Sequence, residues 1–204
     1  MEKYIYIYKN NNSLSPELCN DLIKMFEEET NKYEGVTLGG LDKNIKDTTD
    51  FVIPQNNQKW NKINKLLNKE IQNNIKIYLD LLNDNIDFEN TNQNSSSKYK
   101  MFENTKFIIT NYMLQRYLKE KGKYIYHNDF RINAENKSYR AITYLWYLND
   151  VEEGGETVFF GDYKIKPKMG KLIFFPASWC YPHTGKMPLS SNKYIITGWL
   201  YVNF

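Results

Sequence analysis

The sequence predicts a mostly β domain with flanking helices, an α+β fold class, and two observations support this prediction. Short strand-like segments separated by turns fill the chain from residue 107 onward. Two amphipathic helix patterns lie within the first 98 residues, and they need a sheet against which to bury their apolar faces. A chain of 204 residues in which 16% of the side chains are aromatic is long enough for one domain with a sizeable core.

The first part of the chain, residues 1–98, is expected to be a helical support region whose helices brace the sheet. Ser15 and Pro16 form a helix start, with serine as the N-cap and proline at the first helical position. The polar tract over 85–98 is expected to be a flexible insert, and a substrate lid is the alternative interpretation. The elements expected here are strands over 4–8 and 48–53 and helices over 15–29 and 59–83.

The second part of the chain, residues 107–204, is expected to be a β core. Many short strands joined by turns favour a sandwich or a barrel. The turns are expected at the glycines between the segments, including Gly122, Gly170 and Gly185. The strands are expected at 107–117, 124–130, 139–148, 157–159, 171–175 and 194–202.

The only two histidines of the chain lie where a mononuclear metal site needs them. His127 opens a His-Asn-Asp triplet, and His183 follows 56 residues later. In an extended strand residues i and i+2 point to the same face, so His127 and Asp129 can reach one ion while Asn128 points away. Two imidazoles and one carboxylate match the facial triad of non-haem Fe(II) oxygenases. With the third ligand near a late strand, a double-stranded β-helix, or jelly roll, with the metal inside its mouth fits best.

A structural interpretation of the same residues is weighed against the metal site. Asp and Glu make up 24 of the 204 residues, so an acid two places after a histidine arises readily by chance. Cys19 and Cys180 are the only cysteines, and they support neither a disulfide framework nor a thiolate zinc site. The metal interpretation therefore depends on the sequence around the triplet.

The sequence around the triplet resembles the 2-oxoglutarate/Fe(II) dioxygenases, and within them the prolyl 4-hydroxylase-like branch. The resemblance covers residues 107–202, and its end, from His183 through Lys193 to Trp199, matches the branch in spacing and in residue type. A lysine rather than an arginine at this position is typical of the branch. The densest stretches are 140–150, 154–159 and 166–176.

The resemblance implies a role for each of eight residues. His127, Asp129 and His183 would bind Fe(II), and Lys193 would pair with the distal carboxylate of the co-substrate 2-oxoglutarate. O2 would be the second co-substrate, with ascorbate as a reductant. The residues that would line or hold the 2-oxoglutarate pocket are Tyr117, Tyr147, Thr197 and Trp199.

Alternation of side chains along the predicted strands supports this set. Because side chains alternate between the two faces of a strand, Thr143, Leu145 and Tyr147 are expected to share one face of the strand over 139–148. In the alternative interpretation, Tyr117, Tyr147 and Trp199 are ordinary core aromatics of an aromatic-rich chain. The residues that share a face of the last strand are Lys193, Ile195, Thr197, Trp199 and Tyr201.

Composition narrows the partners and the location. The net charge of +3 comes without a block of Lys and Arg, so nucleic acid is not supported as a partner. No run approaches the roughly 18 apolar residues that a membrane span needs. Because the first residues lack the apolar centre of a secretory signal, we expect a soluble, intracellular, cytoplasmic protein.

We therefore expect a single 2-oxoglutarate/Fe(II) dioxygenase domain over 1–204, with a jelly-roll catalytic core over 107–204. It is expected to hydroxylate a C–H bond, foremost that of a prolyl residue in a peptide or protein substrate. The polar loop over 130–139 and Arg140 are expected to lie at the substrate entrance, and a plain surface loop is the alternative interpretation. Two alternatives stay open: the same chemistry on a free amino acid, a nucleobase or another small metabolite, and a non-catalytic module that binds metal or an oxo acid.

Overall fold

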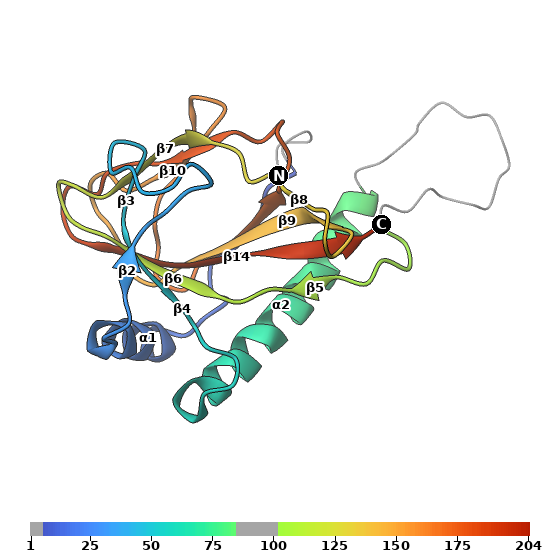
Figure 1. Ribbon diagram of the computed structural model, residues 1–204, viewed down its shortest axis with the longest axis horizontal. Coiled ribbons are helices and arrows are strands. Elements are labelled where there is room, and N and C mark those ends of the chain that lie inside the picture. Colours follow the sequence, from blue (N-terminus) through green and yellow to red (C-terminus); the bar gives the residue numbers. More distant parts are fainter. Residues whose placement is uncertain (1–5, 85–101) are drawn as a thin grey trace, which may run out of the picture.

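The computed structural model describes residues 6–84 and 102–204, and in this part of the chain two β-sheets face each other while two helices cover one of them (Figure 1). The fold is mostly β with flanking helices, as predicted from the sequence. The expected insert over 85–98 lies outside the described residues. Within the described ranges, no helix is both long and apolar enough to span a bilayer.

The larger sheet has nine strands among the residues described, and long strands form its centre. β9 (Ser138–Tyr147) lies between β12 (Leu172–Pro176) and β14 (Lys193–Asn203), and β6 (Met113–Tyr117) follows β14; each of these pairs is antiparallel. Residues 143, 193 and 197 are thereby brought onto neighbouring strands. The other strands are β1 (Tyr8–Asn10) on β12, β4 (Thr49–Val52) on β6, β2 (Tyr33–Glu34) on β4, β5 (Ile108–Ile109) on β14 and β8 (Ile132–Asn133) on β9.

The smaller sheet has five short strands in the described part of the chain. β13 (His183–Gly185) lies between β10 (Thr157–Phe159) and β7 (Lys123–His127) and is antiparallel to both. The two edge strands are β11 (Tyr163–Ile165) on β10 and β3 (Lys46–Asp47) on β7. Segments far apart in sequence therefore meet in this sheet.

Both helices pack on the face of the larger sheet that points away from the smaller sheet (Figure 1). α1 (Pro16–Glu28) begins as predicted, because the Ser15 side chain accepts a hydrogen bond from the Leu18 backbone N–H at 3.3 Å. α2 (Gln58–Asp84) agrees with the expected long helix to within a residue at each end. The ring of Tyr78 on α2 lies 5.7 Å from that of Phe174 on β12, centroid to centroid.

Successive side chains along β9 enter two different cores. Tyr144 and Trp146 belong to the cluster that the helices cover, whereas Leu145 and Tyr147 belong to the cluster between the two sheets. Because both faces of the strand are covered, its sequence reads as a nearly continuous apolar run. The cluster between the sheets adjoins the candidate site.

Four of the predicted features differ from the structure. The strand expected over 4–8 begins at Tyr8, since the pairing with β12 runs only from Tyr8 to Asn10, and residues 4 and 5 lie outside the described part. The strand expected over 107–117 is divided into β5 and β6. Four steps from Ile109 to Met113 oppose three steps from Leu200 to Thr197, so one residue bulges out between the two strands.

The other two differences concern the strands that carry the candidate ligands. Gly185 is not in a turn, because it pairs with Thr157 on β10 and with Tyr124 on β7. The strand expected over 124–130 ends at His127, where the Asn128 side chain accepts a hydrogen bond from the backbone N–H of residue 130 at 3.1 Å and turns the chain. The third member of the triplet therefore lies beyond the strand.

Candidate metal centre and its cavity

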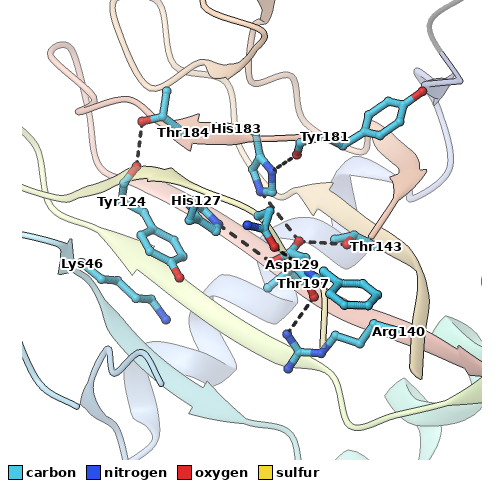
Figure 2. Close-up of polar contacts among 12 residues, drawn as sticks. Lys46, Tyr124, His127, Asp129, Arg140, Thr143, Tyr181, His183, Thr184 and Thr197 are labelled. Atoms are coloured by element: carbon cyan, nitrogen blue, oxygen red, sulfur yellow. Dashed lines mark hydrogen bonds and ion pairs between the residues drawn. The ribbon is translucent and has the colours of Figure 1, made fainter. Parts of the chain in front are cut away.

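His127, Asp129 and His183 converge in the structure. One potential ligand atom from each lies within 4.8 Å of the other two. The Nε2 atom of His127 is 3.9 Å from Asp129 Oδ1, and that of His183 is 3.7 Å from Asp129 Oδ2 (Figure 2). Two imidazole nitrogens and one carboxylate oxygen form a donor set that suits Fe(II) and related first-row ions.

The two histidines are oriented by their own strands. Each Nδ1 lies within hydrogen-bond distance of a backbone carbonyl two residues earlier, at 2.8 Å from Ile125 O for His127 and at 3.1 Å from Tyr181 O for His183. A proton on Nδ1 satisfies that carbonyl and leaves the Nε2 lone pair free. The arrangement therefore presents two Nε2 atoms to one point.

Aromatic rings hold both imidazoles in place. Tyr124 stacks on His127 with the ring centroids 3.5 Å apart, and Phe175 meets His183 edge to face at 4.8 Å. Burial, followed by the nearby His183, lowers the pKa of His127 to about 4. His127 is thus neutral at physiological pH, which is the form that a metal needs.

Asp129 is held by β9 of the larger sheet. Thr143 Oγ1 donates a hydrogen bond to its Oδ2 at 2.8 Å, and Arg140 Nη1 donates to its backbone carbonyl at 3.3 Å (Figure 2). Burial acts to raise the pKa of this carboxyl, but His183, His127 and the Thr143 hydrogen bond together hold the pKa below its usual range. The carboxylate is therefore ionised.

The triad opens into a cavity of about 590 Å³ between the two sheets. Lys193 lies on the wall of this cavity, together with both histidines and Asp129. Its rim carries exposed apolar side chains, among them Leu38 and Phe130. The other wall residues used below are Lys46, Tyr117, Tyr124, Arg140, Thr143, Leu145, Thr197 and Trp199.

Lys193 is a buried cation at the inner part of this wall. Its side chain is 1% exposed, and its Nζ donates to Gly155 O at 3.0 Å and lies 3.9 Å from the ring centroid of Tyr117. Burial lowers the pKa of Lys193 to about 7. Within residues 6–84 and 102–204, no carboxylate lies at ion-pair distance from it.

A second lysine of the cavity wall is already neutralised. Lys46 Nζ lies 2.6 Å from Asp50 Oδ2, and both side chains are buried. Thr48 donates to the other oxygen of Asp50 at 2.7 Å, and Gln115 donates to Oδ2 at 3.0 Å. No sequence pattern singled out this pair, although its members are only four residues apart. Lys193, unlike Lys46, is therefore available to an anionic ligand.

The other predicted pocket residues lie in different surroundings. Tyr117, Thr197 and Trp199 line the cavity, and Thr197 Oγ1 also donates to Tyr144 O at 3.0 Å. Tyr147 is fully buried behind the wall, where its hydroxyl donates to Thr157 Oγ1 at 2.6 Å. Their roles toward 2-oxoglutarate stay predictions.

Arg140 forms a second feature of the site together with an aromatic ring. Its guanidinium lies 3.5 Å from the ring centroid of Trp199, and its Nε donates to Tyr201 Oη at 2.9 Å. The sequence placed Arg140 at the entrance but not on this ring. Alternation alone would have found part of the arrangement, because 199 and 201 were expected on one face.

The comparisons with known proteins agree with this geometry. Residues 112–201 match the 2OG-Fe(II) oxygenase superfamily. The chain is 34% identical over 111 residues to a probable prolyl 4-hydroxylase 10 and 33% identical over 110 residues to a probable prolyl 4-hydroxylase 3, both from Arabidopsis thaliana. These matches cover 40% and 39% of this chain and 38% of each relative. The chain thus matches well under half the length of these relatives.

Solved structures share the fold over nearly the whole chain. A viral collagen prolyl hydroxylase from Paramecium Bursaria Chlorella virus-1, in a 2OG complex, superposes with a TM-score of 0.61 at 23% identity and covers 96% of both chains. A prolyl hydroxylase from Trichoplax adhaerens, in complex with a hypoxia inducible factor peptide, superposes with a TM-score of 0.68 at 18% identity and covers 97% of this chain and 84% of that one. At such identities these likenesses show the fold.

The predicted resemblance is confirmed by these comparisons. Residues 112–201, which carry the triad and Lys193, match the 2OG-Fe(II) oxygenase superfamily, and the two relatives in sequence described above are probable prolyl 4-hydroxylases.

Proposed function

We propose that this protein is an Fe(II)- and 2-oxoglutarate-dependent dioxygenase that hydroxylates a prolyl residue in a peptide or protein. One observation carries the proposal: the His127, Asp129 and His183 triad and the unpaired cation of Lys193 lie on the wall of the same cavity. An oxo acid with two carboxylates can bind the metal through its oxo acid end and pair with the lysine through its distal carboxylate. The prolyl hydroxylases among the similar proteins support the substrate class.

In this proposal the two facing sheets are the double-stranded β-helix, and the triad lies at its mouth. α1 and α2 brace the outer face of the larger sheet through the apolar cluster that they share with it. The smaller sheet contributes the two histidines, whereas the larger sheet contributes Lys193. The cavity between the sheets is then the site where co-substrate and substrate meet.

The triad residues are suited to the metal that the family uses. His127 and His183 would offer their Nε2 atoms and Asp129 a carboxylate oxygen, which leaves the remaining coordination positions to small ligands. When bound, Fe(II) supplies the oxidative chemistry in which O2 converts 2-oxoglutarate to succinate and CO2 and one oxygen atom is inserted into a substrate C–H bond. The neutral state of His127 favours this binding.

Lys193 orients the co-substrate in this proposal. Its ammonium would pair with the distal carboxylate of 2-oxoglutarate, and the Tyr117 and Thr197 hydroxyls on the same wall would add hydrogen bonds. Burial makes this pairing strong, because little water competes with it. The positive charges of the metal and Lys193 would then balance the negative charges of Asp129 and of the two carboxylates of 2-oxoglutarate.

The outer part of the cavity suits a peptide. Leu38 is 80% exposed and Phe130 is 44% exposed at the rim, and these apolar side chains favour an uncharged, partly apolar segment of chain. Arg140 stacked on Trp199 offers N–H donors beside a flat ring near the triad. A backbone carbonyl and a pyrrolidine ring match these two surfaces.

Peptide hydroxylation assayed by mass spectrometry tests the proposal. The enzyme is incubated with Fe(II), 2-oxoglutarate and ascorbate, with proline-containing peptides or with the same peptides carrying alanine in place of proline. We expect only the proline peptides to gain one oxygen atom, with a matching release of succinate above the peptide-free background. With the His127→Ala variant we expect neither peptide oxidation nor additional succinate. Oxygen gain by a free amino acid or another small metabolite, with no peptide in the panel modified, would contradict the peptide substrate.

A further inference from the structure

The three candidate ligands are held by two different sheets. His127 and His183 are directly opposed in the pairing of β7 with β13, so strand register fixes both within the smaller sheet. Asp129 lies beyond the end of β7 and has no place in that register. Something other than strand pairing must therefore fix the position of its carboxylate.

The contacts of Asp129 come from β9 in the larger sheet. Thr143 Oγ1 donates to the carboxylate itself at 2.8 Å, whereas Arg140 donates to the backbone carbonyl at 3.3 Å. Thr143 is 2% exposed, and its strand is paired on both sides, opposite Phe175 of β12 and Trp199 of β14. A residue in the centre of a sheet is among the most rigid anchors that a loop carboxylate can have.

We propose that Thr143 is a positioning residue for the metal site, whose hydrogen bond sets the Asp129 carboxylate toward the Nε2 atoms of the two histidines. The inference rests on the proposed metal site and adds to it a residue outside the triad. A carboxylate rotates readily about its terminal bond, and a donor on one oxygen restricts this rotation and turns the free lone pairs toward the histidines. Outer hydrogen bonds of this kind typically change metal affinity about 10- to 100-fold.

The side chain type suits this role. Threonine donates a hydrogen bond without bringing a positive charge, so it orients the carboxylate without competing with the metal for its negative charge. Its β-branched shape packs well in a strand and restricts the χ1 angle. Valine has the same shape without the donor, which gives an isosteric test of the hydroxyl.

Metal affinity in the absence of turnover tests the proposal. Co(II) is titrated anaerobically into the wild type and the variants Thr143→Val and Thr143→Ser, with the visible absorption of the bound ion as the readout. We expect Thr143→Val to bind Co(II) about 10- to 100-fold more weakly and with an altered spectrum, and Thr143→Ser to stay within a few-fold of the wild type.

Thr48→Val is the matched control. Thr48 is also a buried threonine whose hydroxyl donates to a carboxylate, that of Asp50 at 2.7 Å, and neither of these two residues lines the cavity. We expect this variant to lose stability but to keep its Co(II) affinity and spectrum. Folding of each variant is checked by circular dichroism before titration.

The outcomes separate a positioning role from a structural one. Wild-type affinity in Thr143→Val, an equal loss in Thr143→Ser, or an equal loss in Thr48→Val would overturn the proposal. Failure of the wild type to bind Co(II) would overturn it as well, together with the metal site. Metal binding that depends on the Thr143 hydroxyl, in a protein that hydroxylates no peptide, would leave this inference standing and contradict only the proposed substrate.

Discussion

His127 on β7 and His183 on β13 are directly opposed partners in one antiparallel strand pair, and the centroids of their rings lie 4.3 Å apart. The two histidines are 56 positions apart in sequence, and the chain between them passes through β9 and β12 of the larger sheet and β10 and β11 of the smaller one. Because register fixes the two rings against each other, the pair is formed before any metal arrives. A preformed site of this kind couples metal binding to the stability of the fold.

Removing one histidine should abolish metal binding and leave the fold intact. His127→Ala removes a ring at the end of a short strand and leaves the apolar clusters untouched. A ligand present at 100 times its Kd stabilises a folded protein by about 2.7 kcal/mol, so Mn(II) should raise the melting temperature of the wild type and not that of the variant. Thermal unfolding with and without Mn(II) measures this, and an undiminished shift in His127→Ala would rule out the triad.

Replacing Lys193 by methionine should weaken 2-oxoglutarate binding strongly. Truncating one partner of a buried charge pair costs about 2 kcal/mol or more, which is about 30-fold or more in Kd. Isothermal titration calorimetry of the Mn(II)-loaded protein without O2 measures the Kd directly. Methionine fills a similar volume, so folding should be unaffected or slightly improved.

Arg116→Gln is the control for Lys193→Met. Arg116 is a cation near the same strand pair, but its Nη1 bonds to Glu27 at 2.9 Å and it does not line the cavity. Its replacement should leave the Kd for 2-oxoglutarate unchanged. An unchanged Kd in Lys193→Met combined with a loss in Arg116→Gln or Arg140→Gln would move the anchor to an arginine.

The affinity for 2-oxoglutarate should fall as the pH rises above about 7. The folded protein holds the Lys193 pKa at about 7, compared with 10.5 for an exposed lysine, because burial disfavours the ammonium. The carboxylate of 2-oxoglutarate favours the ammonium, so binding takes up a proton above pH 7 and weakens with increasing pH. Calorimetric titrations between about pH 6 and pH 9 should show this trend in the wild type and lose it in Lys193→Met.

The stability of the ligand-free protein should change with pH in the opposite direction. Between about pH 7 and pH 10.5 the unfolded chain keeps the Lys193 proton that the folded protein has lost. Because the unfolded state then binds more protons, the Lys193 contribution to the free energy of unfolding rises with pH through this window. The difference between the unfolding free energies of the wild type and Lys193→Met, measured in urea at several pH values, gives the Lys193 contribution. A Lys193 contribution that falls as the pH rises would exclude a lowered pKa of Lys193 in the folded protein.

Removing the Tyr117 hydroxyl should weaken 2-oxoglutarate binding less than removing Lys193 does. A hydrogen bond to a charged group contributes about 1.5–3 kcal/mol, so Tyr117→Phe should raise the Kd about 10-fold or more. Tyr112→Phe is the control, since the Tyr112 hydroxyl donates to Asn68 on α2 at 2.6 Å, in the helix-covered core. An equal Kd for 2-oxoglutarate in Tyr117→Phe and the wild type would exclude a hydrogen bond from the Tyr117 hydroxyl to this co-substrate.

Local patterns in the sequence were sufficient for the type of most elements. The Ser15 cap, the long amphipathic helix and the alternation along β14 depend on neighbours within a few residues, and each was found in the structure. The two-residue strands β3 and β8 were not predicted, because two residues carry no period. Their existence depends on the strand that each one pairs with.

The candidate site divides in the same way. The sequence determined that two histidines and an acid were available at triad spacing, that a lysine followed ten residues after the second histidine, and that Lys193, Thr197 and Trp199 share a face. These inferences needed only residue type, spacing and the resemblance to a known family. The expectation that a strand would carry Asp129 was wrong, because the Asn128 turn ends the strand first.

Only the tertiary structure decided which groups share the cavity and which are already satisfied. Register placed His183 opposite His127, β9 supplied the Thr143 donor, and β4 supplied the Asp50 carboxylate that neutralises Lys46 while Lys193 stays unpaired. His127 and His183, like Asp129 and Thr143, lie on segments that only the packing of the two sheets brings together, so no short window of sequence contains these contacts. Lys46 and Asp50 are four residues apart, but their spacing does not show that the pair is buried or that Lys193 has no such partner among the residues described, because burial depends on packing between distant segments.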